Sequence, residues 1–281
     1  MKFTIGCAFL VVVLELAIVG TAAAGAPPSW EVGSYWTYQQ VERVQSASDI
    51  LMGTITYYVV ARIDLLYTTM CAVARVDKSP GGGSILSPLT VHVFEPGSQQ
   101  PQVWPFPAQA GPIMIAREKG AMLGEGGSQT VQTVYPAGDK SSTQEFSIQQ
   151  GAMEKVTVPA GVFPNALRFG YQEKINMPAS VFPGSRQSPG QYSWQAEGTA
   201  WWSSDVAGWV QIEGHGQGSH PGGYADTHYT LVLSDWGRLS KKNLQAKLSA
   251  ALTDTSSFNP VMAEVIRQQF QGIGLDLNNE K

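Results

Sequence analysis

Histidine and carboxylate side chains gather late in the chain, at His215, His220, Asp226 and His228. Imidazole and carboxylate groups are the ligands that zinc and other transition metals take from proteins. Asp226 and His228 are two positions apart on a predicted strand, so both project from the same face. The competing interpretation, ordinary polar surface beside a glycine-rich loop, is preferred. The four residues remain metal candidates, and no cofactor is expected.

Sequence signatures of common enzyme classes are missing. The chain contains no G-x-S-x-G nucleophile motif, no H-E-x-x-H zinc motif, no phosphate-binding glycine loop and no dinucleotide fingerprint. Ser219 beside His220 is an adjacent pair and not a catalytic triad, because the fold assembles a triad from distant positions. A facing carboxylate pair for glycoside hydrolysis stays open, although solvated strand ends explain the same residues: Glu197, Asp205, Glu213 and Asp226. Enzymatic activity is therefore left open, with a non-enzymatic role favoured.

Tryptophan is the residue type in excess, with 8 in the chain. Trp201 and Trp202 are adjacent on a predicted strand, so they point to opposite faces and one of them needs cover or water. Exposed tryptophans stack on sugar rings, and such a platform would use Trp104, Trp194, Trp202 and Trp209. The alternative is that large aromatic side chains fill the core of a curved sheet, and this interpretation is favoured.

Residues 1–24 have the pattern of a secretory signal peptide. Lys2 supplies a basic start, residues 8–19 form an apolar run, and small residues end at Ala24. Glu15 interrupts the apolar run and argues against an uncleaved membrane anchor. We expect an exported protein, periplasmic or extracellular, with no transmembrane segment in the mature part.

Removal of the signal peptide would leave Cys71 as the only cysteine, because the chain has 2 cysteines and the other is Cys7. An intramolecular disulfide is then impossible, so the fold must depend on its core. Lys and Arg number 18 against 22 Asp and Glu, and no basic cluster is present. Nucleic acid is therefore not an expected partner.

Alternating apolar residues predict a mainly β fold. The clearest run is 53–63, in which Ile55, Tyr57 and Val59 share one face with Ala61 and Ile63. Residues 154–171 predict two strand segments interrupted at Pro159–Ala160–Gly161. We expect this interruption to be a bulge or sharp corner that lets the sheet curl.

Further strands and two helices are predicted after this point. Residues 199–213 predict a hairpin, and residues 224–234 a strand that follows a glycine-rich loop at 214–223. Ser240 and Asn259 are helix N-cap candidates, and Pro260 suits a first helical turn. The predicted division is a signal peptide at 1–24, an antiparallel β domain at 25–237 and a helical segment at 238–281 packed on that domain.

Three motifs stand in the order VGSYWTY from Val32, VTVPAGVFPNALR from Val156 and AWWSSDVAGWV from Ala200. In that order and spacing they resemble a family of bacterial exported proteins of unknown function, whose curved half-barrel is similar to that of the periplasmic lipoprotein carriers. The resemblance covers most of the span 30–235 and implies a curved sheet with a concave apolar face, which could hold an acyl chain. Its motifs are structural, so it transfers no catalytic residue. Ser34 and the additional Trp209 depart from the family pattern, and the two helices and the proline-rich loop at 96–112 fall outside it.

The predicted fold is mainly β, a curved antiparallel sheet (half-barrel or open barrel) with two C-terminal helices. The predicted function is an exported, non-enzymatic protein that binds a hydrophobic or lipid-like ligand in the concave face of the sheet. A carbohydrate or cell-wall binding module with exposed tryptophans is the alternative, and a metal-dependent hydrolase is the third hypothesis. No protein partner is indicated. The residues expected to contact the ligand are Trp36, Tyr57, Val59, Trp104, Phe169, Trp202 and Trp209.

Overall fold

A computed structural model describes residues 30–44, 50–65, 68–94, 128–137, 140–178, 191–220 and 223–277. The predicted signal peptide, the proline-rich loop at 96–112 and Trp104 within it lie outside the described residues.

The described strands form one antiparallel sheet. Of its 11 strands, all but β5 follow a single hydrogen-bonded path in the order β4-β3-β2-β1-β11-β10-β9-β8-β7-β6, and β5 pairs with β3. The path ends at β4 and at β6, so the sheet is not closed within the described residues. Two helices, α2 and α3, follow the last strand. The predicted fold class, a mainly β antiparallel sheet with two C-terminal helices, is confirmed.

The chain divides into two compact units, which are described separately. Unit 1 comprises Met1–Thr37, Gly53–Met114 and Asp235–Lys281. Unit 2 comprises Tyr38–Met52 and Ile115–Ser234.

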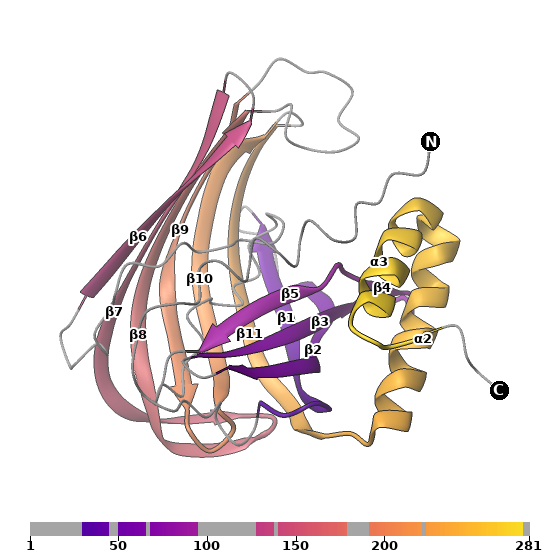
Figure 1. Cartoon of the computed structure of the whole chain (residues 1–281). Coiled ribbons are helices and arrows are strands. Elements are labelled where there is room, and N and C mark those ends of the chain that lie inside the picture. The colour runs from indigo at the N-terminus through magenta and orange to yellow at the C-terminus, as the bar shows by residue number, and fades with distance from the viewer. Residues whose placement is uncertain are drawn as a thin grey trace. The chain divides into compact units, whose positions relative to one another are not determined.

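Unit 2 is a series of long antiparallel hairpins (Figure 1). Its strands are β6 (Ser128–Ala137), β7 (Lys140–Val158), β8 (Gly161–Pro178), β9 (Gln191–Ser203), β10 (Gly208–His220) and most of β11 (Gly223–Arg238). The predicted tryptophan hairpin is confirmed, because β9 and β10 pair on either side of a turn at 204–207. Ala207 in this turn has a φ of 42°, the left-handed conformation that a tight reversal requires.

The interruption at Pro159 and Ala160 is a hairpin turn and not a corner within a continuing strand. Val158 lies opposite Gly161, so the chain reverses from β7 into β8. Gly161 has a φ of 143°, a conformation that residues with side chains rarely adopt. The expected bulge lies instead within β7, whose register shifts between Gln150 and Met153 and again between Glu154 and Val156.

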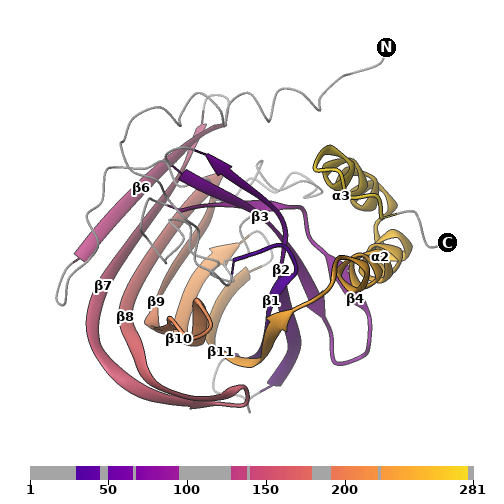
Figure 2. The same cartoon turned by 60° about the horizontal axis from the view of Figure 1, so that its bottom comes forward.

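The tip of the β7–β8 hairpin reaches β11. The amide of Ala160 donates a hydrogen bond to the carbonyl of Leu233 at 3.1 Å. Figure 2 shows β7 and β8 bending past the turn between β9 and β10. The hairpin therefore curls within unit 2, as we expected of this stretch. Its end is a reversal of the chain and not a corner.

The predicted glycine-rich loop at 214–223 is mostly strand. β10 continues to His220 and pairs with both β9 and β11. Aromatic side chains from β8, β9 and β11 fill the space beside its glycines: the Tyr171 hydroxyl and the Tyr229 ring lie over Gly214, and the Trp194 ring lies over Gly216. Glycine weakens an isolated strand, which is why the local pattern predicted a loop. The covering side chains come from other strands, and their packing stabilises this segment as a strand.

Unit 1 combines short strands with both helices. It contains the start of β1 (Ser34–Val44), nearly all of β2 (Ile50–Leu65), and also β3 (Thr68–Lys78), β4 (Ser84–Leu86), β5 (Thr90–Phe94), α2 (Lys241–Phe258) and α3 (Pro260–Gly272). The register between β2 and β3 shifts between Val59 and Ala61. This bulge ends the predicted alternation, and Ile63 is 50% exposed instead of sharing the buried face of Ile55.

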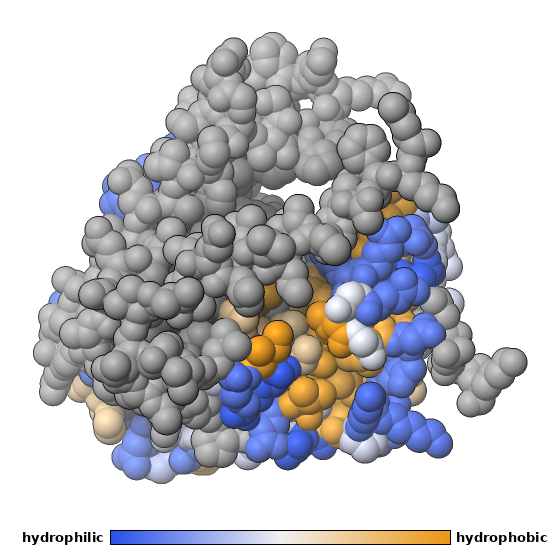
Figure 3. All heavy atoms as spheres, viewed as in Figure 1, coloured by the Kyte–Doolittle hydropathy of each residue, from blue (hydrophilic) through white to orange (hydrophobic). Residues whose placement is uncertain are grey.

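The helices begin where the sequence predicted. The side chain of Ser240 accepts a hydrogen bond from the amide of Asn243 at 3.3 Å, and that of Asn259 accepts one from Met262 at 3.0 Å. Leu248 of α2 and Phe270 of α3 pack in one buried cluster with residues of β2, β3 and β4. In Figure 3, hydrophilic residues cover the outward side of the helices and hydrophobic residues lie where they meet the strands. No helix within the described residues is long and apolar enough to cross a lipid bilayer.

Candidate functional site

Strands β8 to β11 of unit 2 carry an apolar face and a polar face. Side chains alternate between the two faces along each strand, and the strand register aligns them across the sheet. The apolar face, as the term is used below, consists of Phe169, Ala200, Trp202, Trp209, Ile212, Leu231 and Leu233, all buried. The polar face consists of Gln172, Glu197, Thr199, Glu213, His215, Asp226, His228 and Thr230.

Three predicted ligand-binding residues meet on the apolar face. The ring of Trp209 lies edge-on to Phe169, with ring centres 5.8 Å apart, and edge-on to Trp202 at 5.2 Å. The hydroxyl of Tyr38 donates a hydrogen bond to the carbonyl of Trp209 at 2.9 Å and fixes that strand position. Edge-to-face aromatic packing adds about 0.5–1.5 kcal/mol per pair beyond area burial. The structure thus brings Phe169, Trp202 and Trp209 together in one rigid cluster.

A row of two tyrosines and two glycines crosses the sheet next to this cluster. Tyr171, Gly198, Gly214 and Tyr229 are successive register partners on β8, β9, β10 and β11. The two tyrosine hydroxyls meet above the glycines, 2.6 Å apart, and Tyr171 also donates to the carbonyl of Glu213 at 3.3 Å. We call these four residues the tyrosine–glycine row. It places two hydroxyl groups beside the apolar residues of this face.

Burial changes the acidity of both hydroxyls. Desolvation, with the neighbouring Tyr229 as a second cause, raises the pKa of Tyr171 well above that of an exposed tyrosine. Desolvation likewise raises the pKa of Tyr229 to about 12, and the charge of Glu173 raises both pKa values further. Glu173 follows Tyr171 on the same face and is only 6% exposed. Both hydroxyls therefore stay protonated at neutral pH and can donate or accept hydrogen bonds.

The polar face contains an open depression of about 740 Å³. Its lining includes Gln172, Glu197, Glu213, His215 and His228. Gly170 contributes to the floor, where a Cβ atom would meet nothing within 4 Å. The depression therefore offers hydrogen-bonding and charged groups, unlike the apolar hollow that the sequence predicted.

Three of the four metal candidates come together on this polar face. His215 of β10 lies directly opposite His228 of β11, and their rings stack with centres 4.3 Å apart. Nε2 of His215 lies 2.7 Å from a carboxylate oxygen of Asp226. The backbone of His220 belongs to β10, but its side chain lies outside the described residues. The predicted shared face of Asp226 and His228 is thus confirmed, with His215 added from the neighbouring strand.

The remaining predicted ligand-binding residues belong to unit 1. Trp36, Tyr57 and Val59 are all buried there, and the ring of Trp36 lies 4.8 Å from that of Trp30. Trp104 lies outside the described residues. The seven predicted residues therefore do not form one cluster within either unit.

Two of the four tryptophans proposed for a sugar-binding platform are buried. Trp202 and Trp209 are 4% and 3% exposed, so neither can stack on a sugar ring at the surface. Trp194 is half-buried and lies over Gly216. The premise of exposed tryptophans is therefore wrong for Trp202 and Trp209, which belong to the buried apolar face, and Trp104 lies outside the described residues.

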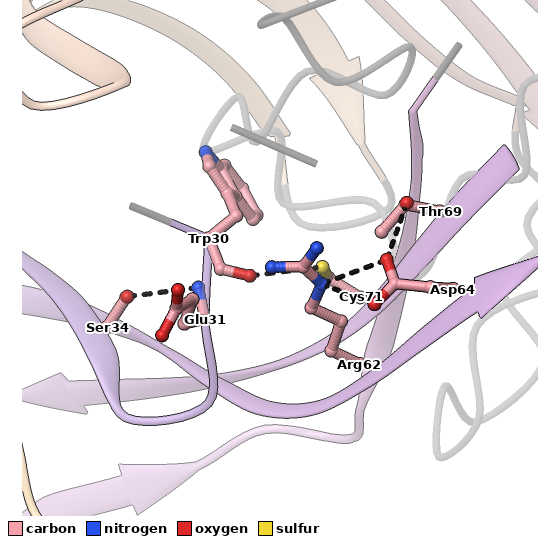
Figure 4. Close-up of polar contacts among 7 residues, drawn as sticks. All are labelled: Trp30, Glu31, Ser34, Arg62, Asp64, Thr69 and Cys71. Atoms are coloured by element: carbon pink, nitrogen blue, oxygen red, sulfur yellow. Dashed lines mark hydrogen bonds and ion pairs between the residues drawn. The ribbon is translucent and has the colours of Figure 1, made fainter. Parts of the chain in front are cut away.

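Cys71 is a buried residue of unit 1 and not a reactive thiol. Figure 4 shows its sulfur close to the carbonyl of Trp30, to which it donates a weak hydrogen bond at 3.6 Å. Desolvation raises the pKa of the Cys71 thiol to about 12. The nearby Arg62 guanidinium pairs instead with Asp64, which also accepts a hydrogen bond from Thr69. A thiolate nucleophile is therefore not available at neutral pH.

The tyrosine pair and Glu173 were not predicted as site residues. Tyr171 and Tyr229 could each be assigned to a buried face from alternation alone. Their meeting required the register of four strands and the two glycines between them. The burial of the Glu173 carboxylate has no local sequence signal, apart from the position of this residue in the alternation of β8.

Comparisons with known proteins give matches in structure only. Neither a protein-family model nor a curated protein sequence matches the chain. A protein from Bacteroides fragilis assigned as exported, with a YmcC-like fold, is 12% identical over 77% of this chain and 100% of its own, with a TM-score of 0.41. A protein from Parabacteroides distasonis assigned as a lipoprotein is 14% identical over 78% and 100%, with a TM-score of 0.40. The hypothetical lipoprotein YmcC from Escherichia coli is 10% identical over 85% and 100%, with a TM-score of 0.28.

These solved structures are of the kind that the three sequence motifs resemble, exported proteins and lipoproteins. With identities and TM-scores this low, the likeness carries no argument about what this chain binds or does.

Proposed function

We propose that the protein is an exported, non-enzymatic binding protein whose apolar face in unit 2 receives an amphiphilic ligand, a hydrocarbon chain with a polar end. The observation that carries the proposal is the tyrosine–glycine row. It sets a hydroxyl pair beside an apolar aromatic cluster, with the buried Glu173 next to it. Small-molecule sites typically combine a mostly apolar lining with a few placed polar groups.

The glycines support the same proposal. Gly198 and Gly214 carry no side chain; the Tyr171 hydroxyl lies over both, and the Tyr229 ring lies over Gly214. The tyrosine side chains fill the space that side chains at these two positions would take. A ligand on this face would therefore meet the row through hydroxyl groups and aromatic rings.

The proposed division of roles follows from the chemistry of each part. Phe169, Trp202 and Trp209 would contact the hydrocarbon chain, whose burial contributes about 0.8 kcal/mol per CH₂ group. The hydroxyl pair would bind the polar end, with the Tyr171 proton turning from the carbonyl of Glu213, 3.3 Å away, to a carboxylate or phosphate oxygen of the ligand. The expected export, from the signal-peptide pattern, would place such a binder among the lipids of a cell envelope.

A fluorescence titration tests this proposal. Trp202 and Trp209 lie in the aromatic cluster, so saturable binding of sodium palmitate or of a lysophospholipid below its aggregation concentration should change the tryptophan emission. The double variant Tyr171→Phe/Tyr229→Phe keeps the rings and removes the hydroxyls. We expect it to bind palmitate about 3- to 10-fold more weakly, since a hydrogen bond contributes about 0.5–1.5 kcal/mol.

The control is Thr199→Ala, a change on the polar face of β9 that should leave palmitate affinity unaltered. The absence of any saturable emission change with either probe would contradict the proposal. Equal palmitate affinity in the wild type and in the double variant would show that the two hydroxyls do not contribute to binding.

A further inference from the structure

We infer that the polar face of β10 and β11 binds a divalent transition-metal ion of the Zn²⁺ class through His215, His228 and Asp226. This inference is independent of the amphiphile proposal, because its residues lie on the opposite face of the same strands. One donor atom from each of the three residues lies within 4.8 Å of the donors of the other two. This is a set of two imidazoles and one carboxylate, a combination that zinc and related ions take in open sites.

The sheet holds the two histidines in place. His215 and His228 are register partners, and the pairing of β10 with β11 is unbroken from Gln211 to His220. Asp226 precedes His228 by two residues, so it lies on the same face. Three donors thus come from two hydrogen-bonded strands, and a metal ion would need no ordering of a loop.

The present distances need only side-chain rotation to fit an ion. Ligand atoms about 2.0–2.2 Å from a tetrahedral zinc ion lie about 3.3–3.6 Å from one another. The pair Nε2 of His215 and the Asp226 oxygen is closer than this, at 2.7 Å, and the stacked imidazole rings have their centres 4.3 Å apart. The side chains of His215 and Asp226 are 34% and 39% exposed, so both can turn. Asp226 can also orient His215 as a hydrogen-bond acceptor while the imidazoles bind the ion.

The surroundings favour a cation. Glu197 lies opposite His215 on β9, and Glu213 lines the same depression. Among the described residues that line the depression, none is a lysine or an arginine. The added negative charge attracts a divalent ion, and the open depression leaves room for water to complete its coordination. A histidine–aspartate contact that only stabilised the surface would not need a second imidazole stacked on the first.

The test is zinc binding by the full chain after removal of any affinity tag and of bound metal with a chelator. Isothermal titration with Zn²⁺, checked by elemental analysis after dialysis, should give one ion per chain. His215→Ala and His228→Ala should each weaken binding at least about tenfold, and Asp226→Asn about 10- to 100-fold if it orients or ligates. Zn²⁺ should also raise the thermal midpoint of the wild type and not that of the His215→Ala/His228→Ala double variant.

The matched control is Gln217→Ala, which removes a polar side chain from the same face of β10, opposite Asp226, without removing a metal ligand. Circular dichroism of each variant separates loss of binding from loss of folding. The inference is overturned if the wild type binds no stoichiometric zinc, or if the folded double variant binds zinc as tightly as the Gln217→Ala control.

Discussion

The side chains of Tyr171 and Tyr229 occupy the space that a Cβ atom would need at Gly214. Such an atom would overlap the Tyr171 hydroxyl and lie 2.6 Å from the Tyr229 ring. We therefore expect Gly214→Ala to lower the free energy of unfolding by about 1–3 kcal/mol, the usual cost of overpacking. Urea unfolding followed by tryptophan fluorescence measures this change.

Gly170→Ala is the matched control for that substitution. A Cβ atom at Gly170 meets nothing within 4 Å, and this strand position lies on the opposite face. The control should leave stability unchanged or raise it by up to about 1 kcal/mol, because alanine loses less backbone entropy than glycine on folding. Equal free energies of unfolding in the two variants would contradict the close packing of Tyr171 and Tyr229 against Gly214.

The buried tyrosines also predict a loss of stability at alkaline pH. Folding raises the pKa of Tyr171 and raises that of Tyr229 to about 12, so the folded state holds these protons more tightly than the unfolded chain. Their contribution is fully present below about pH 10 and is lost as the pH rises through the folded pKa values, by at most about 1.4 kcal/mol per pH unit for each group. Urea unfolding at a series of pH values measures the slope.

The variant Tyr171→Phe/Tyr229→Phe should lose stability less steeply over this alkaline range. Tyr57 and Tyr58 of unit 1 also have raised pKa values through burial, so the slope is reduced and not abolished. Identical slopes in the variant and the wild type would argue against the burial of the hydroxyl pair.

Single residues were predictable where their signal is local. Asp226 and His228 share a face because strands alternate, and this followed from their spacing alone. His215 joins them through the pairing of β10 with β11, which the sequence did not define. The burial of Trp202 and Trp209 was favoured but not assigned to a partner, because alternation places a side chain on a face and does not say what covers that face.

Helix α3 buries one side and exposes the other. Phe270 is fully buried in the cluster that joins the helices to β2, β3 and β4, whereas Val261 is 75% exposed. Phe270→Ala should therefore lower the free energy of unfolding by about 3–5 kcal/mol. Val261→Ala should change it by no more than about 0.5 kcal/mol. Thermal or urea unfolding of the pair checks this, and similar losses from the two changes would mean that α3 does not pack through Phe270.

Elements defined by their own ends were predicted better than elements defined by neighbours. Ser240 and Asn259 begin α2 and α3 because a side-chain cap acts within its own first turn. The stretch around Pro159 was correctly expected to interrupt the strand. Whether it bends or reverses the strand depends on which strand pairs next, and Val158 pairs back with Gly161. The glycines of β10 indicated a loop because their covering rings come from β8, β9 and β11.

At the scale of the whole molecule, the sequence predicted the class of fold and not its strand order. Alternation and the two capped helices were enough for a mainly β antiparallel sheet with a helical end. The position of β11 between β1 and β10 depends on contacts between distant parts of the chain. Such contacts have no local sequence signal, and the same holds for the depression on the polar face of β8 to β11.

The two proposals use opposite faces of the same strands, so they can succeed or fail separately. Zinc binding depends on His215, Asp226 and His228, and amphiphile binding depends on the tyrosine–glycine row and the aromatic cluster. Chelation of metal should leave palmitate affinity unchanged, which a titration with and without a chelator measures. A loss of palmitate binding on chelation would mean that binding at the two sites is coupled, which would contradict their independence.

The central claim is that the apolar face of unit 2 carries an amphiphile. Native mass spectrometry of the chain, exported and purified from its host without detergent, tests it most directly. The account predicts a population of molecules heavier than the chain by the mass of a lipid or fatty acid, depleted in the Tyr171→Phe/Tyr229→Phe variant. A chain that stays at its bare mass, before and after incubation with palmitate and with a lipid extract, would contradict it.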